Sequence, residues 1–167
     1  MPPGLRVAEV GTGTGILARE LAGLGCSVVA VDHSPRMLEA ARANLDEAGV
    51  HGVELRQGTA EALPLSDASV DAAFAHMVLH YLASPADAVR EMARVTKPGG
   101  VVVVVDFERH DREWMREALG VVWLGFPAGD VTGWLADAGL EEPRCQLDPD
   151  ASSRELPRTF IASGRKP

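Results

Sequence analysis

Short apolar runs alternate along the chain with segments in which apolar residues recur every three or four positions. The runs predict buried strands near residues 5–10, 27–32, 53–58, 70–75 and 101–105, and the spaced segments predict helices between them. Strands and helices in strict alternation predict a parallel sheet with helices on both faces. The fifth run is five consecutive valines, which is typical of a central parallel strand.

Helix boundaries are marked by capping residues. Ser34-Pro35 and Ser84-Pro85 each place a hydroxyl cap before a proline in the first helical position. The first of these helices is predicted to turn one apolar face inward, made of Met37, Leu38, Ala41, Leu45 and Ala48. Residues 97–100, Lys-Pro-Gly-Gly, are predicted to end the second helix and turn the chain.

The last third of the chain breaks the alternation. Asp111 is predicted to cap a helix whose apolar positions run from Trp114 to Trp123, and a second helix is expected over residues 130–138. Strands are expected at 143–147 and 159–164, joined by a polar loop over 148–157. The expected fold is a single α/β domain over residues 1–167, a three-layer αβα sandwich. Its sheet is mostly parallel and seven-stranded, with an antiparallel last strand.

Three glycines at alternate positions follow the first predicted strand, in Glu9-Val10-Gly11-Thr12-Gly13-Thr14-Gly15. Because glycine lacks a Cβ, the backbone of this turn can approach a ligand closely, and the N–H groups at the next helix start can bind an anion. A dinucleotide turn, G-x-G-x-x-G, needs its third glycine at position 16, which is Ile16. A nicotinamide-dependent dehydrogenase is therefore disfavoured.

Asp32 ends the second predicted strand. Ligands of open parallel sheets bind at the carboxyl ends of the strands, where a carboxylate can accept hydrogen bonds from both ribose hydroxyls. The glycine turn and Asp32 together predict a bound ribonucleoside.

Charge and composition limit the kinds of partner molecule that the sequence predicts. The net charge of −8 argues against nucleic acid as the main partner. Cys26 and Cys145 lie singly in apolar segments and are predicted to be separate thiols, so no metal site is expected. No apolar stretch has the roughly 18 residues that a membrane span needs, and no targeting segment is visible. These features predict a cytoplasmic protein.

The pattern E-x-G-x-G-x-G resembles the first motif of the class I, Rossmann-like S-adenosylmethionine-dependent methyltransferases. Residues 58–65 and 76–82 are similar to segments of the small-molecule type found in ubiquinone and menaquinone biosynthesis. Residues 110–117 and 122–126 resemble the methyltransferase domain that some bacterial chains fuse to a winged-helix regulator. The resemblance implies methyl transfer from S-adenosylmethionine to a small-molecule substrate, with S-adenosylhomocysteine as product.

The resemblance also implies a set of cofactor-binding residues. Glu9 is expected to orient the ammonium end of the cofactor, and Met37 to pack against adenine. The family usually has aspartate at position 59, so Thr59 shifts the contact with adenine to the backbone around Ala60 and Glu61. The full expected set is Glu9, Gly11, Thr12, Gly13, Gly15, Asp32, His33, Met37, Thr59, Ala60, Glu61 and His76.

Candidate bases lie near the end of the fourth predicted strand. His76, His80 and Tyr81 are the catalytic candidates, and His110 joins them if its loop closes over the pocket. The pattern leaves the acceptor atom open among carbon, oxygen, nitrogen and sulfur. An arsenite methyltransferase is disfavoured because two isolated cysteines supply too few thiolates.

Relatives usually carry one or two helices before the first strand, and these cover the active site. The first strand is predicted at residue 5, so we expect no such N-terminal cap helices, and an open pocket or one closed by a second copy or another polypeptide. The alternative to an enzyme is a module that binds S-adenosylmethionine as a sensor without turnover.

Overall fold

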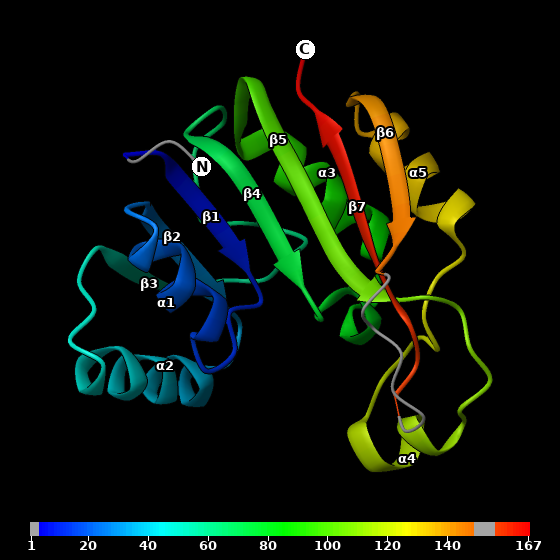
Figure 1. The fold of residues 1–167 in the computed structure, drawn as a ribbon, viewed down its shortest axis with the longest axis horizontal. Helices are drawn as coiled ribbons and strands as arrows, with labels where there is room; N and C mark the ends of the chain where they lie inside the picture. Colours follow the sequence, from blue (N-terminus) through cyan, green and yellow to red (C-terminus); the bar gives the residue numbers. More distant parts are fainter. Residues whose placement is uncertain (1–3, 149–155) are drawn as a thin grey trace.

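The computed structural model describes residues 4–148 and 156–167, and it shows a seven-stranded sheet in the order β3-β2-β1-β4-β5-β7-β6 (Figure 1). The strands are β1 (Arg6–Val10), β2 (Ser27–Asp32), β3 (Val53–Gln57), β4 (Val70–His76), β5 (Thr96–Phe107), β6 (Glu141–Leu147) and β7 (Thr159–Arg165). The helices are α1 (Ile16–Gly23), α2 (Pro35–Glu47), η1 (Leu79–Tyr81), α3 (Pro85–Val95), α4 (Trp114–Leu119) and α5 (Ala128–Asp137).

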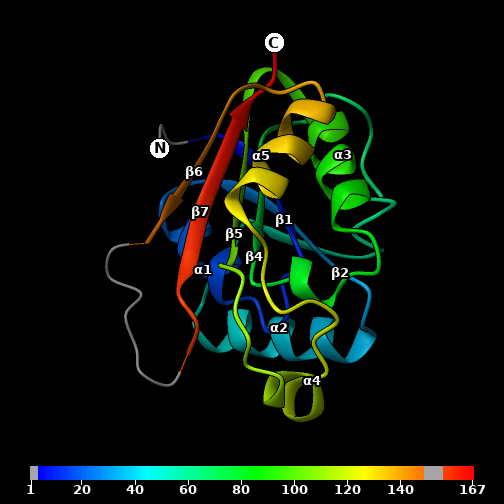
Figure 2. The ribbon, with the colours of Figure 1, turned by 90° about the vertical axis from the view of Figure 1, so that its right-hand side faces the viewer.

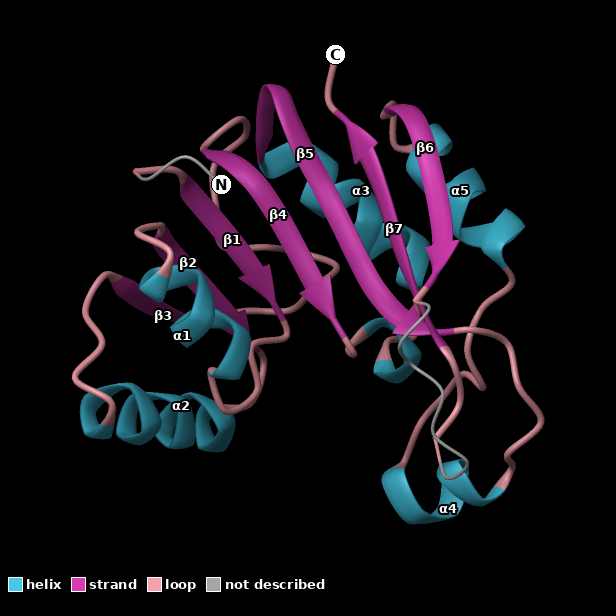
Figure 3. Cartoon of the chain, in the orientation of Figure 1, coloured by secondary structure: helices cyan, strands magenta, loops and turns pink. Residues whose placement is uncertain are grey.

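The sheet confirms the predicted fold class. The first five strands pair in parallel, and β7 is antiparallel to both β5 and β6. Helices α3 and α5 cover one face of the sheet, while α1 and α2 lie on the other side near β1, β2 and β3 (Figures 1 and 2). Among the described residues, no helix lies in front of β4, β5 and β7 in the view of Figure 3.

The core has two main parts, one on each face of the sheet. The larger packs β4 and β5 against α3 and α5, with Val89, Met92 and Leu135 fully buried. The smaller packs α1 onto β1 and β2 through Ala18 and Leu21. Burial of these aliphatic side chains holds the strand ends in register.

The cap of α2 is as predicted, but its inward face is narrower. Ser34 Oγ accepts a hydrogen bond from Met37 N–H at 3.3 Å. Only Ala41 and Leu45 of the predicted face are buried, whereas Met37 is 42% exposed and Ala48 is exposed. The prediction was wrong for these two residues because each end of α2 extends past the layer that Ala41 and Leu45 contact.

Other predictions at element ends were also wrong. Ser84 precedes α3 but its hydroxyl makes no cap hydrogen bond, and Glu113, not Asp111, precedes α4. Helix α4 ends at Leu119, because Gly120 adopts φ +70° and the chain then turns back, so no helix reaches Trp123. Trp114 and Trp123 are 48% and 41% exposed, and only Met115 of α4 is buried. Residues 97–100 belong to β5, which begins at Thr96 opposite Val70.

The polar loop predicted over 148–157 lies mostly at 149–155, outside the described residues. Cys26 and Cys145 are both free thiols, Cys26 buried and Cys145 half-buried. Within residues 4–148 and 156–167, no helix combines the length and apolarity needed to cross a bilayer.

Candidate functional site

The glycine turn connects β1 to α1 and is anchored on β2. Gly11 N–H and Thr12 N–H both donate to the Val31 carbonyl, at 2.8 and 3.0 Å. Gly11, Gly13 and Gly15 have φ values of +74°, +54° and +80°, in the left-handed region that disfavours residues with a Cβ. Alternate glycines therefore allow the chain to turn sharply at the carboxyl end of the sheet.

The three glycines differ in what an added Cβ would meet. A Cβ on Gly11 would lie 2.3 Å from Val78 Cγ2, and one on Gly15 would lie 3.2 Å from Ala41 Cβ. A Cβ on Gly13 would meet no protein atom within 4 Å. Packing thus excludes a Cβ at Gly11 and crowds one at Gly15, while Gly13 leaves its side of the turn open to a ligand.

Asp32 lies beside this turn at the end of β2. One carboxylate oxygen accepts Gly13 N–H at 2.8 Å, and the other accepts Ser34 N–H at 2.9 Å. Its side chain is buried, whereas the neighbouring His33 side chain is 81% exposed. Each carboxylate oxygen keeps a free lone pair, so Asp32 can still accept hydrogen bonds from a ligand's hydroxyl groups.

Glu9 lies beneath the turn and is almost fully buried. Its Oε2 accepts a hydrogen bond from Thr12 Oγ1 at 2.6 Å. Burial raises the pKa of Glu9 to about 7, against the lowering effect of the Thr12 hydrogen bond. The nearby charge of Asp32 adds to this rise. Glu9 therefore changes charge near neutral pH, at a position where an ammonium group would favour its ionised form.

Four of the expected cofactor residues share one cavity. Gly11, Asp32, His33 and Ala60 line it together with residues that the sequence interpretation had not included, namely Val31, Gly58, Val78 and Leu82. The cavity volume is about 30 Å³, close to the volume of one water molecule, so its walls have to part to admit a nucleoside. Val78 and Leu82 follow β4, in the segment 76–82 that resembles the family, but their apolar side chains did not distinguish them from core residues.

The other expected cofactor residues are not among those that line this cavity. Thr59 is exposed and forms an isolated bridge with Ala62, and Glu61 is half-buried. Met37 is exposed on the first turn of α2. His76 is exposed at the end of β4, opposite Val105 of β5.

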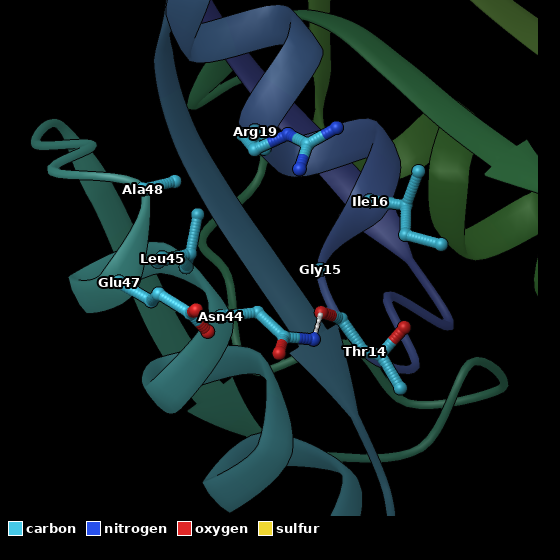
Figure 4. A pocket seen from close by; sticks show the side chains of 8 residues that line it. All are labelled: Thr14, Gly15, Ile16, Arg19, Asn44, Leu45, Glu47 and Ala48. Carbon is cyan, nitrogen blue, oxygen red and sulfur yellow. Dashed lines mark hydrogen bonds between the residues drawn. The ribbon is translucent and has the colours of Figure 1, made fainter.

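Helix α2 supports the glycine turn from behind. Asn44 Nδ2 donates to the Thr14 carbonyl at 3.0 Å, across a hollow of about 410 Å³ between α1 and α2. Figure 4 shows the Asn44 side chain reaching the main chain of Thr14, with Glu47 on the same side of the hollow as Asn44. The turn is therefore held on one side by β2 and on the other by α2.

A second polar cluster lies at the ends of β4 and β5. His80 Nδ1 is 2.7 Å from Asp106 Oδ1, and both side chains are buried. Asp106 Oδ1 also accepts Phe107 N–H at 2.7 Å, so this carboxylate acts as an acceptor and His80 Nδ1 carries the proton. His80 Nε2 is then left as a proton acceptor, the tautomer that a general base needs.

Tyr81 and His76 differ from His80 in their surroundings. The Tyr81 ring is 4.2 Å from the His80 ring between centroids, and Tyr81 is 46% exposed. Of the three predicted catalytic candidates, only His80 is held by a buried carboxylate. Sequence reasoning missed Asp106, although an acidic residue that ends a central strand is the same signal that identified Asp32.

The chain after β5 folds back onto this cluster. Val122 N–H and Trp123 N–H both donate to the His80 carbonyl, at 2.9 and 3.0 Å. Trp123 Nε1 donates to the Leu82 carbonyl at 2.8 Å. A small apolar cluster of Phe107, Met115, Val121 and Leu124 packs this segment against the end of the sheet. In the described part of the chain, no group of three or more His, Cys, Asp or Glu residues is arranged to hold a metal ion.

The comparison with known families agrees with this geometry. A family described as "Methyltransferase domain" matches residues 8–104, from β1 into β5. That span contains the glycine turn, Asp32 and His80. The chain belongs to this methyltransferase family. Its fold and motifs are those of the class I S-adenosylmethionine-dependent type.

Similar proteins cover the chain to different extents. A ubiquinone biosynthesis O-methyltransferase of Methylocella silvestris is 32% identical over 160 residues, which cover 96% of this chain and 57% of that protein. An uncharacterized methyltransferase of Mycobacterium tuberculosis is 44% identical over 113 residues, covering 67% of this chain and 44% of that protein. The chain therefore spans about half the length of these curated relatives.

The fold also matches a solved structure. The methyltransferase solved in complex with the Haloferax volcanii Trm112 activator, described there as putative, has a TM-score of 0.83 and 24% identity. The match covers 100% of this chain and 84% of that one. At this identity the likeness shows a shared fold.

Proposed function

We propose that this chain transfers a methyl group from S-adenosylmethionine to a small-molecule acceptor. The observation that carries the proposal is the buried Asp32 carboxylate, held against the open side of the glycine turn by Gly13 N–H. A turn with this acid beside it fits the ribose and the amino-acid end of S-adenosylmethionine. The homologous ubiquinone biosynthesis enzyme supports a small-molecule acceptor.

The residues present fit the cofactor in three respects. Gly13 has no protein neighbour that a Cβ would meet, which leaves room for a ligand against the backbone. Asp32 can accept from the ribose hydroxyls, and Glu9 can face the ammonium group, directly or through water. When bound, S-adenosylmethionine supplies a methyl carbon already activated by its sulfonium.

The chain's own contribution is alignment, exclusion of water and removal of a proton. We assign the base to His80, because Asp106 holds its Nδ1–H and leaves Nε2 to accept. The bound cofactor would supply the electrophilic methyl carbon and take back the sulfur–carbon electron pair, and His80 Nε2 would take up the proton that the acceptor loses. His76 and Tyr81 lie close to His80 in sequence and are proposed to contact the cofactor or the acceptor.

We further propose that a second copy or another polypeptide covers the bare face of β4, β5 and β7. Phe74, Val103 and Ile161 lie on that face, and Ile161 is 46% exposed. A hollow of about 740 Å³ extends over it and is lined by Phe74, Val101 and Val103 among others. The Trm112 complex supports the idea that this fold works with a partner chain. Light scattering of the purified chain would show a dimer if the cover is a second copy.

The function is tested in two steps. Titration calorimetry should show S-adenosylhomocysteine binding to the wild-type chain, at least 100-fold weaker binding to Asp32→Asn, and unchanged binding to Asp46→Asn, a matched change on the outer side of α2. Turnover of labelled S-adenosylmethionine is then measured against phenols, quinols, thiols and amines. Binding without transfer to any acceptor would favour the sensor alternative. Binding of NAD in place of S-adenosylhomocysteine would refute both.

A further inference from the structure

His110 lies in the segment between β5 and α4 and has an unusual hydrogen-bonding state. Its Nδ1 accepts a hydrogen bond from Arg112 N–H at 3.2 Å. Because an N–H already points at Nδ1, the ring proton is on Nε2. That Nε2–H is buried, and no acceptor for it is found among residues 4–148 and 156–167.

A buried donor without an acceptor destabilises a folded protein, so one that persists requires an explanation. The His110 side chain is not loose: its backbone N–H donates to the Leu124 carbonyl at 3.0 Å, and its ring meets Phe107 edge-on at 5.7 Å. Burial lowers the pKa of His110, and the neighbouring Arg112 lowers it further. His110 is therefore a neutral, fixed donor at neutral pH.

His110 lies in the same part of the fold as His80, the proposed base. The His80 and His110 rings both pack against Phe107, with the His80 ring 5.1 Å away. The His110 backbone N–H donates to the Leu124 carbonyl, and Val122 and Trp123 in the same stretch after α4 donate to the His80 carbonyl. His110 also lines a surface hollow of about 490 Å³ with Arg109 and Leu124, large enough for a small molecule.

We infer that His110 Nε2–H binds the oxygen atom of the methyl acceptor and selects an oxygen acceptor over nitrogen and sulfur. The inference rests on the proposed function. His80 Nε2 accepts and His110 Nε2 donates, and a hydroxyl can satisfy both at once.

The number of lone pairs on the acceptor atom determines the selectivity among hydroxyl, amine and thiol acceptors. A hydroxyl oxygen has two lone pairs, so one can accept from His110 while the other attacks the methyl carbon, and its proton goes to His80. An amine nitrogen has a single lone pair, which cannot accept from His110 and attack together. A thiol sulfur is a weak acceptor and leaves the buried His110 donor nearly unpaired.

The test uses phenol, aniline and thiophenol as matched probes on the full chain with S-adenosylhomocysteine bound. Nitrogen–proton NMR follows the His110 ring, assigned with His110→Gln. We expect phenol to shift the Nε2 resonance and the other two probes to leave it in place. His110→Leu should bind phenol at least tenfold more weakly. His110→Gln, which keeps an N–H at similar reach, should stay within about threefold, and so should His51→Leu, a control on an exposed loop.

Two NMR results would overturn the role of His110. One is an Nε2 resonance that does not shift when phenol is added, and the other is an equal shift with all three probes. Because the NMR arm uses the wild-type chain, it gives an answer even if His110→Leu does not fold. Calorimetry on the same samples separates the proposals: failure of wild type to bind S-adenosylhomocysteine overturns the proposed function, whereas intact binding without a phenol response overturns the role of His110 alone.

Discussion

The Asp32 carboxylate accepts a hydrogen bond from Gly13 N–H at 2.8 Å, so the end of β2 orients the turn that follows β1. The register of the two parallel strands places Val31 opposite Val10, which brings Asp32 level with the turn. The Asp32 carboxylate is therefore oriented before any ligand arrives, and binding does not need to reorient it.

The three glycines should respond differently to the same substitution. Gly11→Ala places a Cβ 2.3 Å from Val78, so the free energy of unfolding should fall by about 2–4 kcal/mol, from clash and positive φ together. Gly13→Ala meets no protein atom, so it should cost only about 1 kcal/mol. Yet Gly13→Ala should weaken S-adenosylhomocysteine binding at least tenfold, because the new methyl group enters the ligand's space.

Urea denaturation and calorimetry on both variants measure these two effects separately. Gly129→Ala in α5, where a Cβ also meets nothing, serves as the control for a glycine remote from the site. Wild-type ligand affinity in Gly13→Ala would contradict the placement of the cofactor.

Glu9 should make stability depend on pH in an unusual direction. Its pKa is raised from 4.5 to about 7 in the folded chain, so the folded state keeps a proton that the unfolded state has lost. The free energy of unfolding should therefore fall as pH rises from about 4.5 to 7, by at most about 3 kcal/mol, and then level off. Chemical denaturation at half-unit steps of pH measures this slope.

Glu9→Gln should flatten that slope, and Glu39→Gln on the exposed side of α2 should not. The affinity for S-adenosylmethionine should rise as pH passes through 7, because ionised Glu9 favours the ammonium group. A wild-type affinity that is flat across this range would show that Glu9 does not act on the cofactor.

Asn44 should affect the affinity for the cofactor indirectly, through its hydrogen bond to the glycine turn. Replacing it with alanine removes the hydrogen bond to the Thr14 carbonyl, which should cost about 1 kcal/mol of stability and weaken S-adenosylhomocysteine binding about threefold to tenfold. Glu47→Ala changes a side chain lining the same hollow and should leave the affinity unaltered. Equal effects in both variants would mean that the hollow, and not the hydrogen bond, supports the turn.

Asp106→Asn should separate catalysis from binding. The amide can present its NH₂ group to His80 Nδ1, which moves the ring proton to Nε2 and removes the acceptor. Turnover of an accepted substrate should fall at least 100-fold, while S-adenosylhomocysteine affinity stays within about twofold. NMR of the His80 ring reports the tautomer directly. Unchanged turnover with a reversed tautomer would exclude His80 as the base.

Local patterns predicted most of the elements. The valine run of β5, the Ser34 cap of α2 and the Pro85 start of α3 each depend on residues close in sequence, and the structure contains all three elements. The predicted helix up to Trp123 was wrong because Val122 and Trp123 bond to His80, a residue far away along the chain. A helical spacing of apolar residues cannot report such a contact.

The sequence by itself determined the fold class, the glycine turn and the acid at the end of β2, because strand ends and left-handed glycines are encoded locally. Only the tertiary structure decided which residues meet there. Val78 packs on Gly11, Asn44 reaches Thr14, and Asp106 holds His80, and each pair joins two segments separated by the sheet's crossovers. The buried donor of His110 likewise exists only because its segment folds back on Phe107. These contacts depend on the packing of the whole sheet, so no local pattern specifies them.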